Sequence, residues 1–265
     1  VWVDPNNGVN EGNIIGDINN PFLTIDYAMG MIYPTEDNPI TIHLTAGEFS
    51  PSNNNEVFHL NMFSNVNLIG QGEEVTILDA QQTDRVITIV NCENNVLSNL
   101  TITGGRTDDY PSPDNQGGGI FMDVDSSNPP ILTFLNIIGN SAGWGAGIYL
   151  VHGPNFPGQT TITYVTISEN VGIGGVDPWT TQDFGGGIFM GGGSPILSYV
   201  EISKNKAEVG AGMMLVDSSP ILNQVIITEN IPGYEDDSPY GNYARGGGIF
   251  MEHSSSPILI NVTIS

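Results

Sequence analysis

The chain has 265 residues and a formal net charge of −24, because 29 acidic side chains stand against only 5 Lys and Arg. This balance argues against nucleic acids and anionic membrane surfaces as partners, since both require a basic surface on the protein. The single cysteine excludes a disulfide within the chain, and no apolar run approaches the length of a membrane span.

The first 38 residues are predicted to close one end of the molecule. Residues 1–8 have the pattern of a short strand that ends in an Asn-Gly turn. Residues 21–30 carry apolar side chains at helical spacing, with Pro21 in the first turn. We expect this helix to be a cap, because an open sheet edge invites aggregation.

From residue 39 the chain consists of short β-branched runs bounded by Gly, Asn and Pro, which predict strands. Residues 39–47 form the first of these runs. In the second half, one phrase of three parts recurs. At residues 185–205 it reads GGGIFM, SPIL and VEISKN, and the step from Pro195 to Pro220 is 25 residues. Such a repeat predicts a solenoid in which each coil buries its apolar side against its neighbours. Three strands per coil give three parallel sheets around a narrow core, which is a parallel β-helix.

Alternation along the strand after the glycines predicts which side chains point inward. The first inward file comprises Ile120, Ile148, Ile188, Met213 and Ile249. The second comprises Met122, Leu150, Met190, Leu215 and Met251. The side chains between the two files are expected to form an outward file of Phe121, Tyr149, Phe189, Met214 and Phe250.

A stack of asparagines is predicted at one turn of successive coils, formed by Asn140, Asn170, Asn205 and Asn230. Asn suits a tight turn because its side chain imitates backbone hydrogen bonding and because it tolerates left-handed geometry. We interpret this stack as structural.

The corners before the glycine strands alternate in length. Two short corners, at residues 141–144 and 206–209, separate three long ones at residues 104–116, 171–184 and 231–245. The long corners emerge from the same side of the solenoid, so stacking must bring them together. Loops on one face of a repeat protein commonly carry its function.

The long corners are rich in aromatic and acidic side chains. Aromatic rings stack on sugars, and clustered carboxylates coordinate calcium. The candidates for ligand binding are Tyr110, Trp179, Phe184, Tyr234, Tyr240 and Tyr243. The candidates for a metal site are Asp108, Asp109, Asp177, Asp183, Asp236 and Asp237.

Two interpretations of these loops stay open. In the first, which we favour, the loops fold back over the outward file, because a contiguous exposed apolar strip is unusual unless something covers it. In the second, the loops and the strip form a groove that binds polysaccharide with calcium.

The phrases GGGIF, SPIL and VTISxN resemble those of the secreted right-handed parallel β-helix proteins of bacteria, in the pectate-lyase-like superfamily. They are also similar in style to the repeats of polymorphic outer-membrane proteins. The opening DPNNG at residues 4–8 and PFLTI at residues 21–25 are similar to the start of such proteins. The resemblance implies the fold and a secreted or cell-surface location, but it leaves the activity open because this architecture carries many functions.

Lyases on this scaffold combine calcium with a Lys or Arg base, and the resemblance therefore points to Arg106 and Arg245 at the loop roots. A glycoside hydrolase would need two carboxylates flanking the scissile bond. Asp109 and Asp237, in the adjacent-Asp pairs, are the candidates for that role. No sequence pattern singles out a complete catalytic site.

We therefore expect an N-terminal strand and capping helix over residues 1–38, and a right-handed parallel β-helix over residues 39–265 that continues beyond the end of the chain. The favoured function is adhesion, carbohydrate contact or structural support at a bacterial cell surface, through the loops. The alternatives are a calcium-dependent polysaccharide lyase or glycoside hydrolase, and a filament or surface-layer subunit that associates through the β-helix ends. The expected partner is a polysaccharide or another cell-surface component. Calcium is the candidate cofactor, and no organic cofactor is expected.

Overall fold

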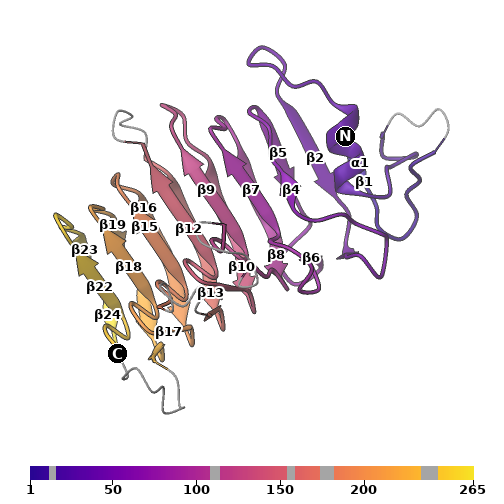
Figure 1. Cartoon of the computed structure of the whole chain (residues 1–265). Coiled ribbons are helices and arrows are strands. Elements are labelled where there is room, and N and C mark those ends of the chain that lie inside the picture. The colour runs from indigo at the N-terminus through magenta and orange to yellow at the C-terminus, as the bar shows by residue number, and fades with distance from the viewer. Residues whose placement is uncertain (12–15, 108–113, 154–158, 174–181, 234–243) are drawn as a thin grey trace.

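The structure, a computed structural model, describes residues 1–11, 16–107, 114–153, 159–173, 182–233 and 244–265. Within these ranges it contains one helix, α1 (Ile25–Met31), and strands in three sheets. Figure 1 shows the strands as coils that follow one another from the N-terminal end, beside α1, to the C-terminal end.

The first sheet has 13 strands. They are β1 (Trp2–Val3), β2 (Ile40–Leu44), β3 (Gly47–Phe49), β5 (Val66–Ile69), β6 (Thr76–Asp79), β8 (Val96–Thr103), β10 (Ile131–Ile138), β13 (Thr161–Ser168), β16 (Ile196–Ser203), β19 (Ile221–Asn223), β20 (Ile226–Thr228), β23 (Ile258–Ile260) and β24 (Thr263–Ile264).

The second sheet has seven strands and carries the glycine phrases. They are β4 (Leu60–Asn61), β7 (Ile87–Val90), β9 (Ile120–Val124), β12 (Ile148–His152), β15 (Ile188–Gly191), β18 (Met213–Val216) and β22 (Ile249–Glu252). The third sheet has four short strands, β11 (Ser141–Ala142), β14 (Val171–Gly172), β17 (Lys206–Ala207) and β21 (Ile231–Pro232).

Neighbouring coils pair in parallel and in one register. Val165 of β13 lies opposite Leu135 of β10 and Val200 of β16, so that equivalent positions of the repeated phrase stack directly on one another. Each phrase is therefore one coil, and the predicted parallel β-helix with three sheets is confirmed.

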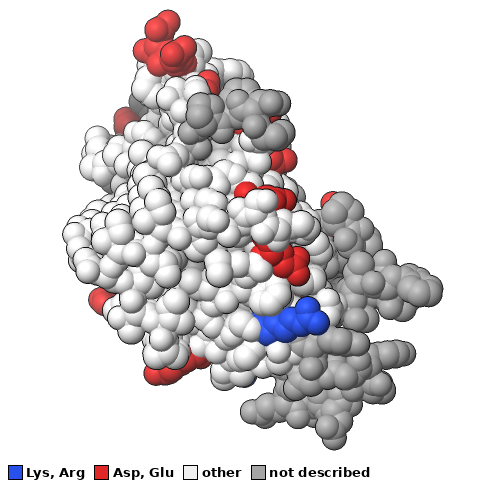
Figure 2. All heavy atoms as spheres, turned by 90° about the vertical axis from the view of Figure 1, so that its left-hand side faces the viewer, with Lys and Arg blue, Asp and Glu red and all other residues white. Residues whose placement is uncertain are grey.

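The core follows the two predicted inward files. From Ile120 and Met122 to Met213 and Leu215, their side chains are fully buried. The last coil differs, because Met251 is 51% exposed and no described coil packs against its far side. Figure 2 looks at this end of the solenoid, where most of the described residues in view are neither acidic nor basic.

The helix predicted near the N-terminus is present, but its expected start was wrong. Phe22 lies in a parallel bridge with Val3 instead of a helical turn, and its N donates a hydrogen bond to the Trp2 carbonyl at 3.0 Å. Thr24 is the N-cap, and its Oγ1 accepts a hydrogen bond from Tyr27 N at 3.2 Å. The helix therefore begins at Ile25.

The buried side chain of Glu56 holds the first turn of α1. Its Oε2 accepts a hydrogen bond from Ile25 N at 2.8 Å, and its Oε1 accepts one from Asp26 N at 2.9 Å. Burial raises the pKa of Glu56 to about 7, although these N–H groups favour the carboxylate. The helix is thus attached to the loop that follows β3. The N-terminal strand β1 is also attached to the solenoid, since it pairs with β2 in the first sheet.

The predicted asparagine stack is confirmed, and it is a continuous hydrogen-bonded ladder inside the solenoid. Asn170 Oδ1 accepts from Asn140 Nδ2, and Asn205 Oδ1 accepts from Asn170 Nδ2, both at 3.0 Å. We expected the asparagine to be the left-handed residue of each turn, and this was wrong. The left-handed residue is the one before it: Gly139, Glu169, Lys204 and Glu229.

The asparagine ladder explains the third glycine of each repeated phrase. A Cβ atom on Gly147 would lie 2.9 Å from Asn170 Nδ2, and one on Gly187 would lie 3.0 Å from Asn205 Nδ2. The glycine therefore leaves the room that the asparagine side chain of the same coil occupies. The first glycine, such as Gly185 with φ +66°, supplies the left-handed turn into the strand.

Candidate functional site

Most residues of the predicted loop site lie outside the described residues. These are Asp108, Asp109, Tyr110, Asp177, Trp179, Tyr234, Asp236, Asp237, Tyr240 and Tyr243. Arg106 and Arg245 are described, at the roots of two loops. Arg106 N donates to the Asp84 carbonyl and Arg245 N to the Glu208 carbonyl, so both backbones are fixed to neighbouring coils.

Phe184 belongs to a second apolar cluster on the outer face of the second sheet. This cluster includes the outward file, in which Tyr149 and Phe189 are buried and stack at 5.0 Å between ring centroids. The Phe184 ring packs edge-on against Trp144 at 5.0 Å. The middle of the outward file is therefore covered, whereas Phe121 and Phe250 at its ends are half-buried, and the short corners contribute to the cover through Trp144 and Val209. The sequence predicted this cover from the long loops alone.

Asp183 is fully buried at the end of a long corner. One carboxylate oxygen accepts a hydrogen bond from Glu208 N, and the other has no partner among the described residues. Burial, and to a smaller extent the nearby Glu208 carboxylate, raises the pKa of Asp183 to about 7. Within the described ranges, no three His, Cys, Asp or Glu side chains gather as a metal site would require. The calcium site stays a prediction.

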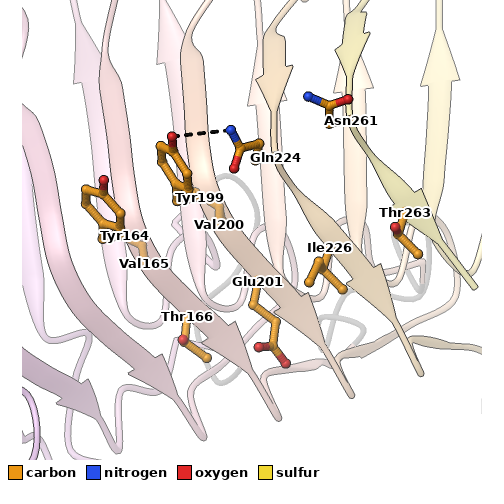
Figure 3. A pocket seen from close by; sticks show the side chains of 10 residues that line it. All are labelled: Tyr164, Val165, Thr166, Tyr199, Val200, Glu201, Gln224, Ile226, Asn261 and Thr263. Carbon is orange, nitrogen blue, oxygen red and sulfur yellow. Dashed lines mark hydrogen bonds between the residues drawn. The ribbon is translucent and has the colours of Figure 1, made fainter.

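A groove that the sequence analysis missed lies on the outer face of the first sheet. Its volume is about 810 Å³. Figure 3 shows two rows of side chains from adjacent coils. The lining residues are Tyr164, Val165, Thr166, Tyr199, Val200, Glu201, Gln224, Ile226, Asn261 and Thr263.

The first row consists of residues in the left-handed backbone region. Phe134, Tyr164 and Tyr199 have φ values of 51°, 56° and 56°. This conformation interrupts the strand alternation, so that the side chains of Tyr164 and the preceding Thr163 both lie outside the core. The three aromatic side chains are 44%, 47% and 45% exposed, respectively.

These three rings form one stack on the surface. The centroids of Phe134 and Tyr164 are 5.0 Å apart with 9° between the ring planes, and those of Tyr164 and Tyr199 are 4.8 Å apart with 14°. Gln224 takes the next position in the row, and its Nε2 donates a hydrogen bond to the Tyr199 hydroxyl at 3.2 Å. The stack of rings thus ends at Tyr199, inside the groove.

The second row supplies mixed chemistry beside the rings. Thr166, Glu201, Ile226 and Thr263 occupy equivalent positions on successive coils. Glu201 Oε1 accepts a hydrogen bond from Ser203 Oγ at 3.0 Å. The groove therefore offers aromatic rings, hydroxyls, amides and one carboxylate within one open surface.

A signal for this row was present in the sequence. Phe134, Tyr164 and Tyr199 each stand directly before the buried Leu or Val of a strand phrase, where strict alternation is broken. The prediction rested on the glycine strands and the long corners, and it did not include the aromatic residues of this part of the phrase.

A second groove of about 610 Å³ lies at the asparagine turn of the same coils. Its charged lining residues are Glu169, Lys204, Lys206 and Glu229. Two acids and two bases leave it without net charge.

No protein-family model matches the chain, and no curated protein sequence matches it. Among solved structures, it is similar to pectin methylesterase PemA from Erwinia chrysanthemi, with 12% identity and a TM-score of 0.52. The match covers 99% of this chain and 78% of that one. The likeness and the parallel coils together settle the architecture. The chain is a right-handed parallel β-helix.

A pectin methylesterase in complex with hexasaccharide VII matches less well, with 10% identity and a TM-score of 0.39, over 95% of this chain and 90% of that one. At these identities the likeness concerns the fold alone. Among the described residues of this β-helix, no helix is long and apolar enough to cross a membrane.

Proposed function

We propose that this protein is an extracellular polysaccharide-binding β-helix, which holds a sugar chain in the groove beside Tyr164 and Tyr199. The observation that carries the proposal is the exposed stack of aromatic rings at the edge of a groove with polar lining. Tyr164 and Tyr199 are 47% and 45% exposed, so that the rings are accessible to a ligand from solvent.

The lining fits the chemistry of a sugar. A pyranose ring has apolar C–H patches and a rim of hydroxyls, so that its site needs apolar contact and a few placed polar groups. Tyr164 and Tyr199 offer ring surface and a hydroxyl each. Thr166, Gln224 and Asn261 supply donors and acceptors beside them.

The register of the coils fits a polymer rather than a single sugar. Equivalent positions recur on each coil, so a chain that lies along the solenoid axis meets the same two rows repeatedly. The similar PemA structure is named as a pectin methylesterase, and pectin is a polysaccharide, which supports a polysaccharide as the ligand. Adhesion to a polysaccharide-coated surface would use the same contacts.

The test is binding to a panel of neutral and acidic polysaccharides, measured by titration calorimetry and affinity electrophoresis. The double variant Tyr164→Ala/Tyr199→Ala should weaken binding at least tenfold, which corresponds to about 1.4 kcal/mol. The matched control is Tyr33→Ala, which removes a ring that is 85% exposed near the N-terminal helix. If the chain binds no polysaccharide, or if the double variant binds as tightly as the parent, the proposal is wrong.

The catalytic and calcium alternatives can be tested on the same samples. Incubation with each polysaccharide, with and without calcium, followed by assays for unsaturated ends, reducing ends and released methanol, separates binding from lyase, hydrolase and esterase activity. Self-association through the β-helix ends predicts a sedimentation coefficient that rises with protein concentration.

A further inference from the structure

The groove beside the tyrosines contains a single side chain that is charged at neutral pH. Of the ten residues that line it, only Glu201 is acidic, and none is Lys or Arg. Glu201 lies between Thr166 and Ile226 of the adjacent coils, so neither neighbour in its row offsets its charge.

The carboxylate of Glu201 is held at the groove. Ser203 Oγ donates a hydrogen bond to Glu201 Oε1 at 3.0 Å. Among the described residues, Glu201 takes part in no salt bridge. A ligand in the groove therefore meets an uncompensated negative charge.

The two lysines of the neighbouring groove do not neutralise the negative charge of Glu201. Lys204 and Lys206 line the second groove, at the asparagine turn, together with Glu169 and Glu229. Each lysine of that groove is thus matched by a glutamate, and the chain as a whole carries −24. An anionic polymer would be repelled by the groove and by the protein as it approaches.

We infer that the groove selects uncharged polysaccharides and rejects polyanionic ones. This inference rests on the proposed function and adds the ligand class to it. A uronate placed beside Glu201 would bring two like charges to roughly 5 Å, which weakens binding by roughly tenfold per contact at low salt. A neutral sugar has no such penalty, and its hydroxyls can donate to the Glu201 carboxylate.

The experiment uses pairs of polymers that share a backbone and differ in charge. One pair is fully methyl-esterified and de-esterified pectin, and the other is hydroxyethylcellulose and carboxymethylcellulose. At low salt, the intact chain should bind the neutral member of at least one pair at least tenfold more tightly. High salt should narrow the difference, because it screens the repulsion.

Two variants locate the effect. At low salt, Glu201→Gln should reduce the difference in affinity between the neutral and the anionic polymer of a pair. Glu201→Lys should reverse this difference, so that the anionic polymer binds more tightly. Glu74→Gln removes the same charge from an exposed position outside the groove and should leave the difference unchanged.

The outcomes separate this inference from the proposed function. If an acidic polymer binds as tightly as its neutral partner at low salt, and the tyrosine variants abolish that binding, the neutral-ligand inference is overturned while polysaccharide binding stands. An unchanged preference in Glu201→Gln also overturns it. Binding to no polymer at all would contradict the proposed function itself.

Discussion

Asn170 accepts two hydrogen bonds from Asn140 on the preceding coil, one from the backbone N and one from Nδ2, each at 3.0 Å. Asn170 also donates through Nδ2 to the Ile137 carbonyl and to Asn205 Oδ1, each at 3.0 Å. It is fully buried. One side chain therefore joins three coils, and all of its hydrogen-bonding partners are protein groups.

The first prediction follows from this position. Asn170→Ala removes all of these hydrogen bonds and leaves buried groups without partners, so it should lower the free energy of unfolding by about 3–5 kcal/mol. Urea unfolding followed by circular dichroism measures the change. The control Asn61→Ala, at an exposed position of β4, should change stability by less than about 0.5 kcal/mol. Equal effects of the two substitutions would contradict a structural ladder.

The second prediction concerns the third glycine. A Cβ atom on Gly187 would lie 2.6 Å from the Gly212 carbonyl oxygen and 3.0 Å from Asn205 Nδ2. Gly187→Ala should therefore destabilise the protein by about 2 kcal/mol. Gly30→Ala, in α1, has nothing within 4 Å of the new methyl group and should be neutral or stabilise slightly, because Ala favours a helix. Calorimetric melting of both variants tests the difference. If Gly187→Ala has the melting temperature of the parent, Gly187 does not pack closely against the asparagine ladder.

The third prediction compares two methionines at the same position of the phrase. Met190 is fully buried between coils, whereas Met251 in the last coil is 51% exposed. Met190→Ala should cost about 2–5 kcal/mol, and Met251→Ala should cost less than about 1 kcal/mol. Denaturant midpoints at several protein concentrations provide the measurement. A large, concentration-dependent cost at Met251 would show that the end of the solenoid is covered by another molecule in solution.

The fourth prediction concerns pH. Burial raises the pKa values of Glu56 and Asp183 to about 7, above those of the unfolded chain. The folded state therefore binds more protons than the unfolded state between about pH 4 and 7. These two groups should stabilise the fold as the pH falls from 8 to 5, and this stability is lost as the pH rises through 7.

Substitutions separate the two carboxyl groups. Asp183→Asn keeps an acceptor for Glu208 N and removes the buried charge, so it should raise the melting temperature at pH 8 and flatten its dependence on pH between 5 and 8. Glu56→Gln should lower stability throughout, because both oxygens of Glu56 accept backbone N–H groups of α1 and an amide offers only one acceptor. If the melting temperature of Asp183→Asn depends on pH in the same way as that of the parent, the carboxyl group of Asp183 does not contribute to the pH dependence of stability.

The features that recur on every coil were predictable from the sequence. The inward file at Met190 follows from an apolar residue, and the ladder at Asn170 from an asparagine, at one position of each phrase, since stacking in register repeats the same environment. The start of α1 was missed although Thr24 is a typical N-cap residue. The contribution of Glu56, which holds the first turn from a distant loop, does not follow from the local sequence. The row at Tyr164 was missed because a left-handed residue breaks the period on which strand prediction relies. The loop site lies outside the described residues, and its chemistry stays a prediction.

The shared register also makes the groove extensible. Tyr199 is the last ring of its row, and Gln224 and Asn261 occupy the next two places without changing any inward position. Gln224→Tyr would lengthen the aromatic row by one coil. The number of sugar units that such a surface holds would then be set by substitutions along a single row, independently of the core that supports it.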